Sequence, residues 1–183
     1  MRFIIIHGAY GSPDDNWIPW LKLRLEEEGH EVIIPKFPTP KGQSLDSWMK
    51  ILDTCEIDEK TILIAHSIGC ALILRKLETS ARKIEAAFLV AGFVGKIADE
   101  KFDKLNSSFF ETEFDWDMIK QNANHFFVYA SDNDPYVNLE KEKSLAKHLA
   151  VEPQIIKGAG HFNTKAGYDT FFKLLEDIKA LTG

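Results

Sequence analysis

The chain has 183 residues, of which 45% are hydrophobic and 27% charged, the length and composition of one globular domain that buries its own core. Its formal net charge is −6, and without a long basic run it lacks the Lys and Arg clusters that bind nucleic acids and anionic lipid surfaces. No apolar segment approaches the roughly 18 residues of a membrane span, and the apolar run after Met1 is too short for a secretory signal.

Short apolar runs alternate with amphipathic stretches, a pattern typical of a parallel sheet covered by helices on both faces. In chain order we expect a strand at 3–6, a helix at 17–28, a strand at 31–35, a helix at 44–54, a strand at 61–66, a helix at 68–77, strands at 86–91 and 125–130, a helix at 139–149, a strand at 154–157 and a final helix at 168–181. Gly29 is placed to end the first helix and Ser44 to cap the second. Residues 93–124 are rich in Phe and acidic residues, and we expect them to form a small lid or a helical excursion within a single domain over 1–183.

A serine stands at the predicted junction between the third strand and the helix that follows it. The segment reads Ala65-His66-Ser67-Ile68-Gly69, which matches the nucleophile elbow with Ala in place of the usual first Gly. The residues two before and two after the serine must be small in that turn, because larger side chains would collide across it. The helix N-terminus also favours a developing negative charge. We expect Ser67 to be a nucleophile; the alternative is that it merely caps the helix.

A serine hydroxyl becomes nucleophilic when a histidine takes its proton and a carboxylate holds that histidine in one tautomer. His161 follows the sixth predicted strand, in a glycine-containing loop that lets the imidazole reach over the strand ends. Asp134 follows the fifth predicted strand, and with Val137 it resembles the D-x-x-V stretch that carries the acid in many such folds. Asp132 is the rival for this role, and a turn without catalytic function is the alternative for both aspartates.

Acyl transfer also needs two backbone N–H groups that stabilise the oxyanion of the tetrahedral intermediate, and losing one typically costs about 3 kcal/mol. We expect one from Ile68 and the other from Ala9, in the His-Gly-Ala-Tyr loop after the first strand, with Tyr10 as second choice. A glycine-rich turn without a ligand is the alternative. The chain lacks the G-K-[ST], G-x-G-x-x-G, H-E-x-x-H and C-x-x-C patterns, so we expect no cofactor and no metal.

The His-Gly-Ala loop, the elbow, the Asp-Pro-Tyr-Val stretch at 134–137 and the Gly-His-Phe stretch at 160–162 occur in a characteristic order and spacing. In this the chain resembles the small single-domain serine hydrolases grouped with retinoblastoma-binding protein nine, over nearly its whole length. The resemblance implies a minimal α/β-hydrolase fold, a three-layer α/β/α sandwich with a mostly parallel six-stranded sheet in the order 2-1-3-4-5-6. The site would lie at the carboxyl ends of the strands.

From this triad we expect a carboxylesterase-like serine hydrolase that cleaves a small ester, or less readily an amide or thioester, through an acyl-enzyme. The alternative is a catalytically silent protein that keeps the pocket as a binding site. Tyr10 and Phe162 flank the site and are expected to touch a small-molecule substrate, whereas the aromatic residues of 93–124 would form either an acyl pocket or core. With only Cys55 and Cys70, too few for a disulfide scaffold, the chain is expected in the cytoplasm; its oligomeric state stays open.

Overall fold

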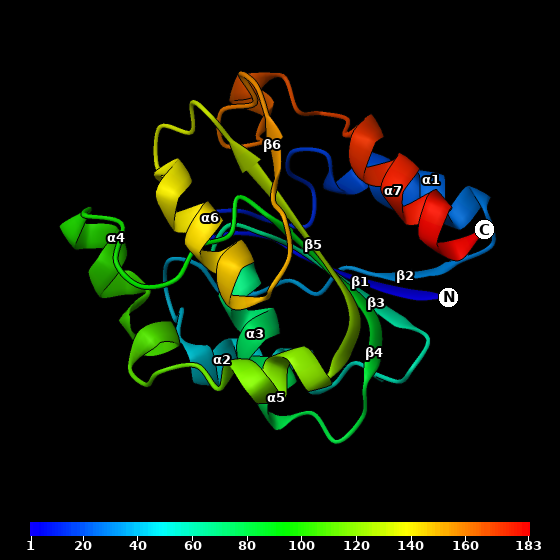
Figure 1. Cartoon of the computed structure of the whole chain (residues 1–183), viewed down its shortest axis with the longest axis horizontal. Coiled ribbons are helices and arrows are strands. Elements are labelled where there is room, and N and C mark those ends of the chain that lie inside the picture. The colour runs from blue at the N-terminus through cyan, green and yellow to red at the C-terminus, as the bar shows by residue number, and fades with distance from the viewer.

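The computed structural model describes residues 1–183 and contains one sheet of six strands (Figure 1). The strands are β1 (Arg2–Ile6), β2 (Glu31–Ile33), β3 (Thr61–His66), β4 (Ile84–Val90), β5 (Ala123–Ser131) and β6 (Gln154–Ile156). Their order is β2-β1-β3-β4-β5-β6, and every neighbouring pair is parallel. The order implied by the family resemblance is confirmed. Because all strands are parallel, the turns that follow them meet at one edge of the sheet.

Seven α-helices cover the two faces of the sheet: α1 (Ile18–Glu27), α2 (Leu45–Leu52), α3 (Gly69–Thr79), α4 (Glu100–Leu105), α5 (Trp116–Gln121), α6 (Leu139–His148) and α7 (Phe172–Thr182). α1 and α7 pack on one face, and α2, α3, α5 and α6 pack on the other (Figure 1). The Ser44 side chain caps α2 as predicted, accepting a hydrogen bond from the Ser47 amide at 3.1 Å. α7 begins at Phe172 and not at residue 168, because the backbone of Phe171, with φ −139° and ψ 77°, is not helical; a separate 3-10 turn at Thr164–Ala166 lies before it.

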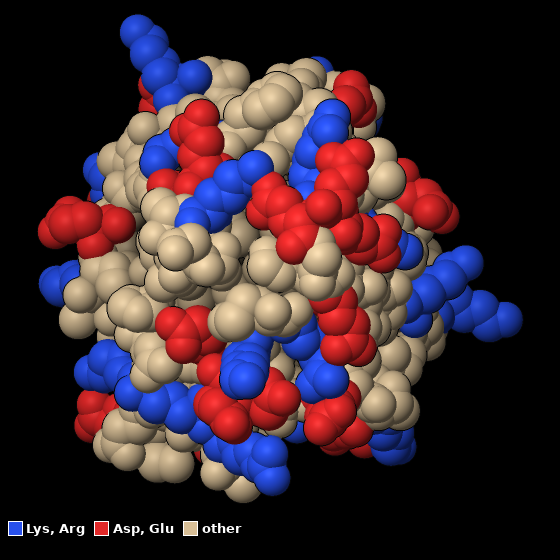
Figure 2. Space-filling view, turned by 90° about the vertical axis from the view of Figure 1, so that its right-hand side faces the viewer, with Lys and Arg blue, Asp and Glu red and all other residues tan.

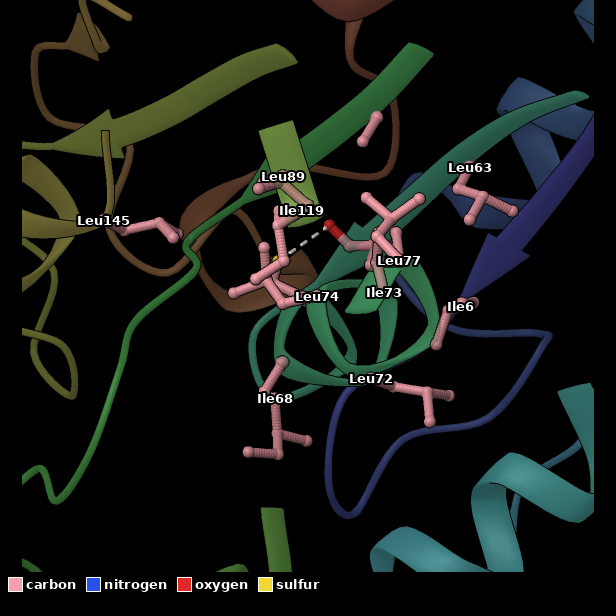
Figure 3. Packing of buried hydrophobic residues seen from close by; sticks show 14 of the residues in the cluster. Ile6, Leu63, Ile68, Leu72, Ile73, Leu74, Leu77, Leu89, Ile119 and Leu145 are labelled. Atoms are coloured by element: carbon pink, nitrogen blue, oxygen red, sulfur yellow. Dashed lines mark hydrogen bonds between the residues drawn. The ribbon is translucent and has the colours of Figure 1, made fainter. Parts of the chain in front are cut away.

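Alternate residues of each strand point to opposite layers, so one apolar core lies on each side of the sheet. Ile4 and Ile6 of β1 join the core under α3, whereas Phe3 and Ile5 join the core under α1 and α7. Figure 3 shows the side chains of α3 among those of the strands and of α5 and α6; the labelled residues are Ile6, Leu63, Ile68, Leu72, Ile73, Leu74, Leu77, Leu89, Ile119 and Leu145. Fully burying one such side chain stabilises the fold by about 1.5–3 kcal/mol, so α3 and the turn that precedes it are firmly held.

The helical excursion expected at 93–124 ends at residue 122, where β5 follows; it packs on α3 and contains α4, α5 and a 3-10 turn between them. Arg75 of α3 anchors it: its Nε donates to the Phe109 carbonyl at 3.0 Å, and its guanidinium carbon lies 3.7 Å from the centre of the Phe114 ring. This combines a charge-assisted hydrogen bond with a cation–π contact. Phe93, Phe109 and Phe114 are buried, so these three aromatic residues belong to the core.

The face that carries α1 and α7 is charged but mixed in sign. Figure 2 shows Lys and Arg interleaved with Asp and Glu there, and no continuous basic patch. The Arg24–Glu27 pair on α1, at 2.8 Å, is one example. None of the helices combines the length and the apolar character needed to cross a bilayer.

Candidate active site

Ser67 occupies a strained turn between β3 and α3. Its φ is +55°, in a region that costs a residue other than glycine of order 1–3 kcal/mol, and its amide donates to the Val90 carbonyl at 2.8 Å. A Cβ at Gly69 would lie 2.8 Å from Ile6 Cγ2 and 2.9 Å from the His7 carbonyl oxygen. Glycine at this position therefore lets α3 start directly against the end of β1. A strained serine before a small residue and a helix is the geometry of a nucleophile elbow.

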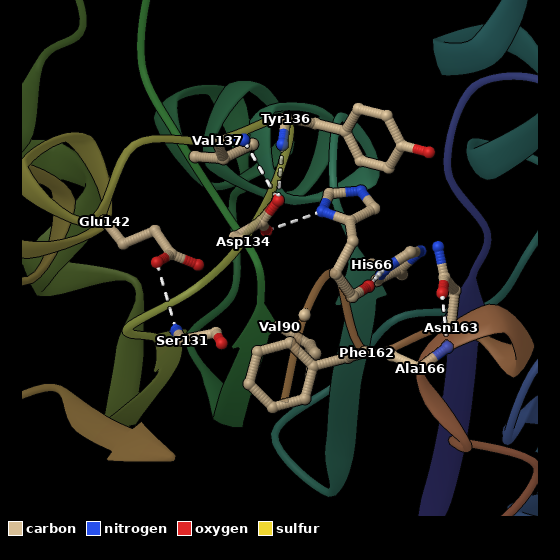
Figure 4. Close-up of polar contacts among 12 residues, drawn as sticks. His66, Val90, Ser131, Asp134, Tyr136, Val137, Glu142, Phe162, Asn163 and Ala166 are labelled. Atoms are coloured by element: carbon tan, nitrogen blue, oxygen red, sulfur yellow. Dashed lines mark hydrogen bonds and ion pairs between the residues drawn. The ribbon is translucent and has the colours of Figure 1, made fainter. Parts of the chain in front are cut away.

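His161 and Asp134 lie in neighbouring turns, after β6 and β5, and contact each other directly. Figure 4 shows Asp134 beside Tyr136 and Val137. His161 Nδ1 is 2.7 Å from Asp134 Oδ2, while Asp134 Oδ1 accepts hydrogen bonds from the amides of Tyr136 at 2.8 Å and Val137 at 3.0 Å. The Asp134 side chain is closed off from solvent, so these three donors replace water around the carboxylate. With Nδ1–H donating to the carboxylate, Nε2 is the ring nitrogen left to accept a proton.

The side chains next to Asp134 tie these two turns together. Asp132 Oδ1 accepts a hydrogen bond from the Gly158 amide at 2.7 Å, and Asn133 Oδ1 accepts one from the Gly160 amide at 2.8 Å. Asp132, the rival for the role of the acid, thus binds the backbone of the adjacent turn and not the imidazole. Sequence reasoning missed Asn133, because a hydrogen bond between turns that follow different strands leaves no local sequence pattern.

Two buried side chains hold the His161 turn from beneath. His66 Nε2 donates to the His161 carbonyl at 2.8 Å, and Trp17 Nε1 donates to the Phe162 carbonyl at 3.1 Å. Burial lowers the pKa of His66 to about 3, so the ring is neutral, with its proton on the nitrogen that makes this bond. Phe162 has a φ of +49°, a conformation that the surrounding contacts must maintain. The sequence gives no local sign of this Trp17 contact, since its acceptor is 145 residues away along the chain.

Two backbone amides beside Ser67, those of Ala9 and Ile68, donate to no other protein group. These are the two donors predicted for the oxyanion. The Tyr10 amide, the second choice, donates to the Thr39 hydroxyl at 2.7 Å. Of these two loop amides, that of Ala9 is therefore the one left for a ligand.

The loop that contains Ala9 is held against Ser67 by His7. Its Nδ1 donates to the Gly8 carbonyl at 2.8 Å, and its Nε2 accepts a hydrogen bond from the Phe37 amide at 3.0 Å. Burial lowers the pKa of His7, which favours the neutral ring that this donor–acceptor pair requires. A Cβ at Gly8 would lie 3.1 Å from Ser67 Cβ, so a glycine here allows the loop to approach the serine closely.

The family model for serine hydrolases matches residues 3–179 of the chain. The chain belongs to this serine hydrolase family. It is 32% identical over 178 residues to the putative hydrolase YdeN of Bacillus subtilis, covering 95% of this chain and 92% of that one. It is 27% identical over 185 residues to the serine hydrolase RBBP9 of Rattus norvegicus, covering 98% and 95%.

Solved structures agree with this assignment. The crystal structure of the ydeN gene product superposes with a TM-score of 0.92 at 30% identity, over 98% of this chain and 97% of that one. A carboxylesterase structure from the thaumarchaeon Nitrososphaera gargenis has a TM-score of 0.73 at 13% identity, over 99% and 90%, which shows a shared fold. The chain is therefore an α/β-hydrolase in fold and a serine hydrolase in family.

The cavity of this serine hydrolase lies above the elbow and has a volume of about 780 Å³. Ser67 and His161 both line it, and their side chains make no hydrogen bond to each other in this structure; such contacts commonly tighten once substrate binds. Charged side chains also line it: Asp14, Asp15, Asp99, Lys101, Lys165 and Asp169. A cavity of this size suits a small-molecule ligand.

The two residues predicted to touch substrate lie in different places. Tyr10 lines the cavity and is 61% exposed. The expectation for Phe162 is corrected: its ring is fully buried and stacks on Phe171, with centroids 5.3 Å apart, in the core under α1 and α7. The backbone of Phe162 is left-handed, and its side chain packs in the core and does not point into the cavity. Among the aromatic residues of 93–124, Phe102 lines the cavity.

Proposed function

We propose that this serine hydrolase cleaves small carboxylic esters through an acyl-enzyme on Ser67, with His161 as general base and Asp134 as the residue that orients it. The observation that carries the proposal is the 2.7 Å contact between His161 Nδ1 and Asp134 Oδ2 beside the cavity that Ser67 lines. The chain order of serine, aspartate and histidine, each after a strand, is the order that α/β-hydrolases use.

In this mechanism the Ser67 hydroxyl attacks the ester carbonyl carbon while His161 Nε2 takes its proton. Asp134 stabilises the imidazolium, and the amides of Ala9 and Ile68 stabilise the oxyanion. Collapse of the tetrahedral intermediate breaks the ester C–O bond, and the imidazolium protonates the departing alcohol. A water molecule then attacks the acyl-enzyme with His161 again as base, which releases the carboxylic acid and returns the proton to Ser67.

Several features support a small ester as substrate. The cavity volume lies within the range of small-molecule sites, and its mouth carries the exposed rings of Tyr10 and Tyr136, which can cover an acyl or alcohol group. The carboxylesterase that shares this fold makes esters the first class to test. Amides and thioesters follow, because the same acyl-enzyme forms from all three.

The test is covalent labelling with a fluorophosphonate probe, followed by mass spectrometry to find the modified residue. We expect labelling at Ser67 in wild type, none in Ser67→Ala and at least 100-fold slower labelling in His161→Ala, because the hydroxyl then lacks its base. A panel of acetyl to octanoyl esters would next define the acyl preference. A folded wild type that the probe does not label would refute the proposal and would favour a catalytically silent binding protein.

A further inference from the structure

Glu142 is an acidic residue in a position that excludes solvent. It lies near the start of α6 and is fully buried, whereas Glu140, two positions earlier, is exposed. Its Oε2 accepts a hydrogen bond from the Ser131 amide at 3.1 Å (Figure 4). Ser131 is the last residue of β5, so Glu142 binds the point at which the turn to Asp134 begins.

Two further hydrogen bonds connect this contact with the turn that carries His161. The Ser131 hydroxyl donates to Asn133 Oδ1 at 2.9 Å, and the same oxygen accepts a hydrogen bond from the Gly160 amide at 2.8 Å. Glu142 therefore lies at the base of a chain of hydrogen bonds that connects α6 with both turns of the His161–Asp134 pair. A shift of its carboxyl group would be transmitted to both.

The other oxygen of this carboxyl, Oε1, is buried without a hydrogen-bond partner. An ionised carboxylate with one amide partner is strongly disfavoured away from water, so the group remains protonated. Burial raises the pKa of Glu142 to about 8, and the negative charge of Asp134 acts in the same direction. The other ionisable group coupled to it is the buried thiol of Cys70 on α3, whose pKa is also raised by burial. No basic side chain stabilises an anion here.

We propose that Glu142 is a positioning residue of the active site, whose neutral carboxyl fixes the Ser131 amide and thereby the turn that presents Asp134 to His161. This inference rests on the triad proposed above. Ionisation of Glu142 places an uncompensated charge beside Asp134 and weakens the packing of α6 on β5. The reactivity of Ser67 therefore falls in alkaline solution, for a reason that lies outside the triad.

The test measures the rate constant of fluorophosphonate labelling at Ser67 from pH 6 to pH 10, which requires no knowledge of the natural substrate. Glu142→Gln keeps an oxygen acceptor for the Ser131 amide and cannot ionise. Glu142→Leu fills a similar volume and offers no acceptor. Glu140→Gln, on the exposed surface of the same helix, is the matched control.

In wild type and Glu140→Gln we expect the rate to fall at least threefold between pH 7.5 and pH 9.5. Glu142→Gln should retain at least half of the wild-type rate at pH 7 and lose this alkaline decrease, and Glu142→Leu should be at least tenfold slower at every pH. The inference is overturned if Glu142→Gln shows the wild-type pH profile, or if folded Glu142→Leu reacts as fast as wild type. Complete lack of labelling of wild type at Ser67 would instead refute the triad itself, and the inference with it.

Discussion

Replacing Asp134 by Asn is the sharpest test of how this site holds the proposed base, His161. Asp134 Oδ1 accepts two backbone hydrogen bonds, from Tyr136 and Val137. An amide nitrogen cannot accept these bonds, so the Asn oxygen must take the Oδ1 position and its NH₂ group must face His161. The imidazole then has to accept through Nδ1 and carry its proton on Nε2. That tautomer cannot take the proton of Ser67.

The expected loss follows from this change of tautomer. Removing the carboxylate while keeping the geometry lowers turnover by about 10³- to 10⁴-fold in serine hydrolases, or about 4–5.5 kcal/mol of transition-state stabilisation. Stability should change much less, because the two backbone hydrogen bonds to residue 134 remain; losing one charge-assisted bond costs about 1.5–3 kcal/mol. The assay is the labelling rate at Ser67, together with kcat on a reactive ester and a urea unfolding curve.

Asp132→Asn is the matched control, since its Oδ1 accepts only the Gly158 amide, a bond that an Asn oxygen can keep. We expect its labelling rate to stay within threefold of wild type. The reasoning would be refuted if a folded Asp134→Asn kept more than a tenth of wild-type reactivity. It would also be refuted if the two variants lost reactivity equally, because the contact of Asp134 with the imidazole would then have no specific effect.

Three further predictions test the framework around the triad. Burial raises the pKa of Glu142 from an ordinary 4.5 to about 8, so its neutral carboxyl contributes stability that is fully present below pH 4.5 and is lost as the pH rises to about 8. The free energy of unfolding of Glu142→Gln in urea should therefore increase by about 3–5 kcal/mol relative to that of wild type across this interval. The same dependence of this free energy on pH in both proteins would contradict the prediction. Gly69→Ala should lower the free energy of unfolding by about 2 kcal/mol, because its Cβ would lie 2.8 Å from Ile6 Cγ2, and an unchanged thermal midpoint would count against the steric argument. Trp17→Phe leaves the buried Phe162 carbonyl without its indole donor, so we expect a loss of about 1–3 kcal/mol in urea and slower labelling at Ser67; wild-type values for both would show that this bond does not hold the turn.

The sequence alone was sufficient to predict the strands of the sheet and the turns that carry the site residues. Continuous apolar runs indicated buried parallel strands, whereas the order of the strands, which the structure confirms, was implied by the resemblance to a known family. Small residues around Ser67 indicated a tight turn between a strand and a helix, and its φ of +55° agrees with that reading. These signals are local, because strand burial, helix caps and turn sterics depend on residues a few positions apart.

Only the tertiary structure decided which polar groups meet. It brings Asp134 and not Asp132 to the imidazole, turns the ring of Phe162 into the core, and places Trp17 and His66 under the His161 turn. It also buries Glu142 on a helix whose neighbouring acidic residue is exposed. The physical reason is that these contacts join turns after different strands, so their partners are set by sheet order and by the desolvation of each group. Neither quantity is encoded in the spacing of residues along the chain.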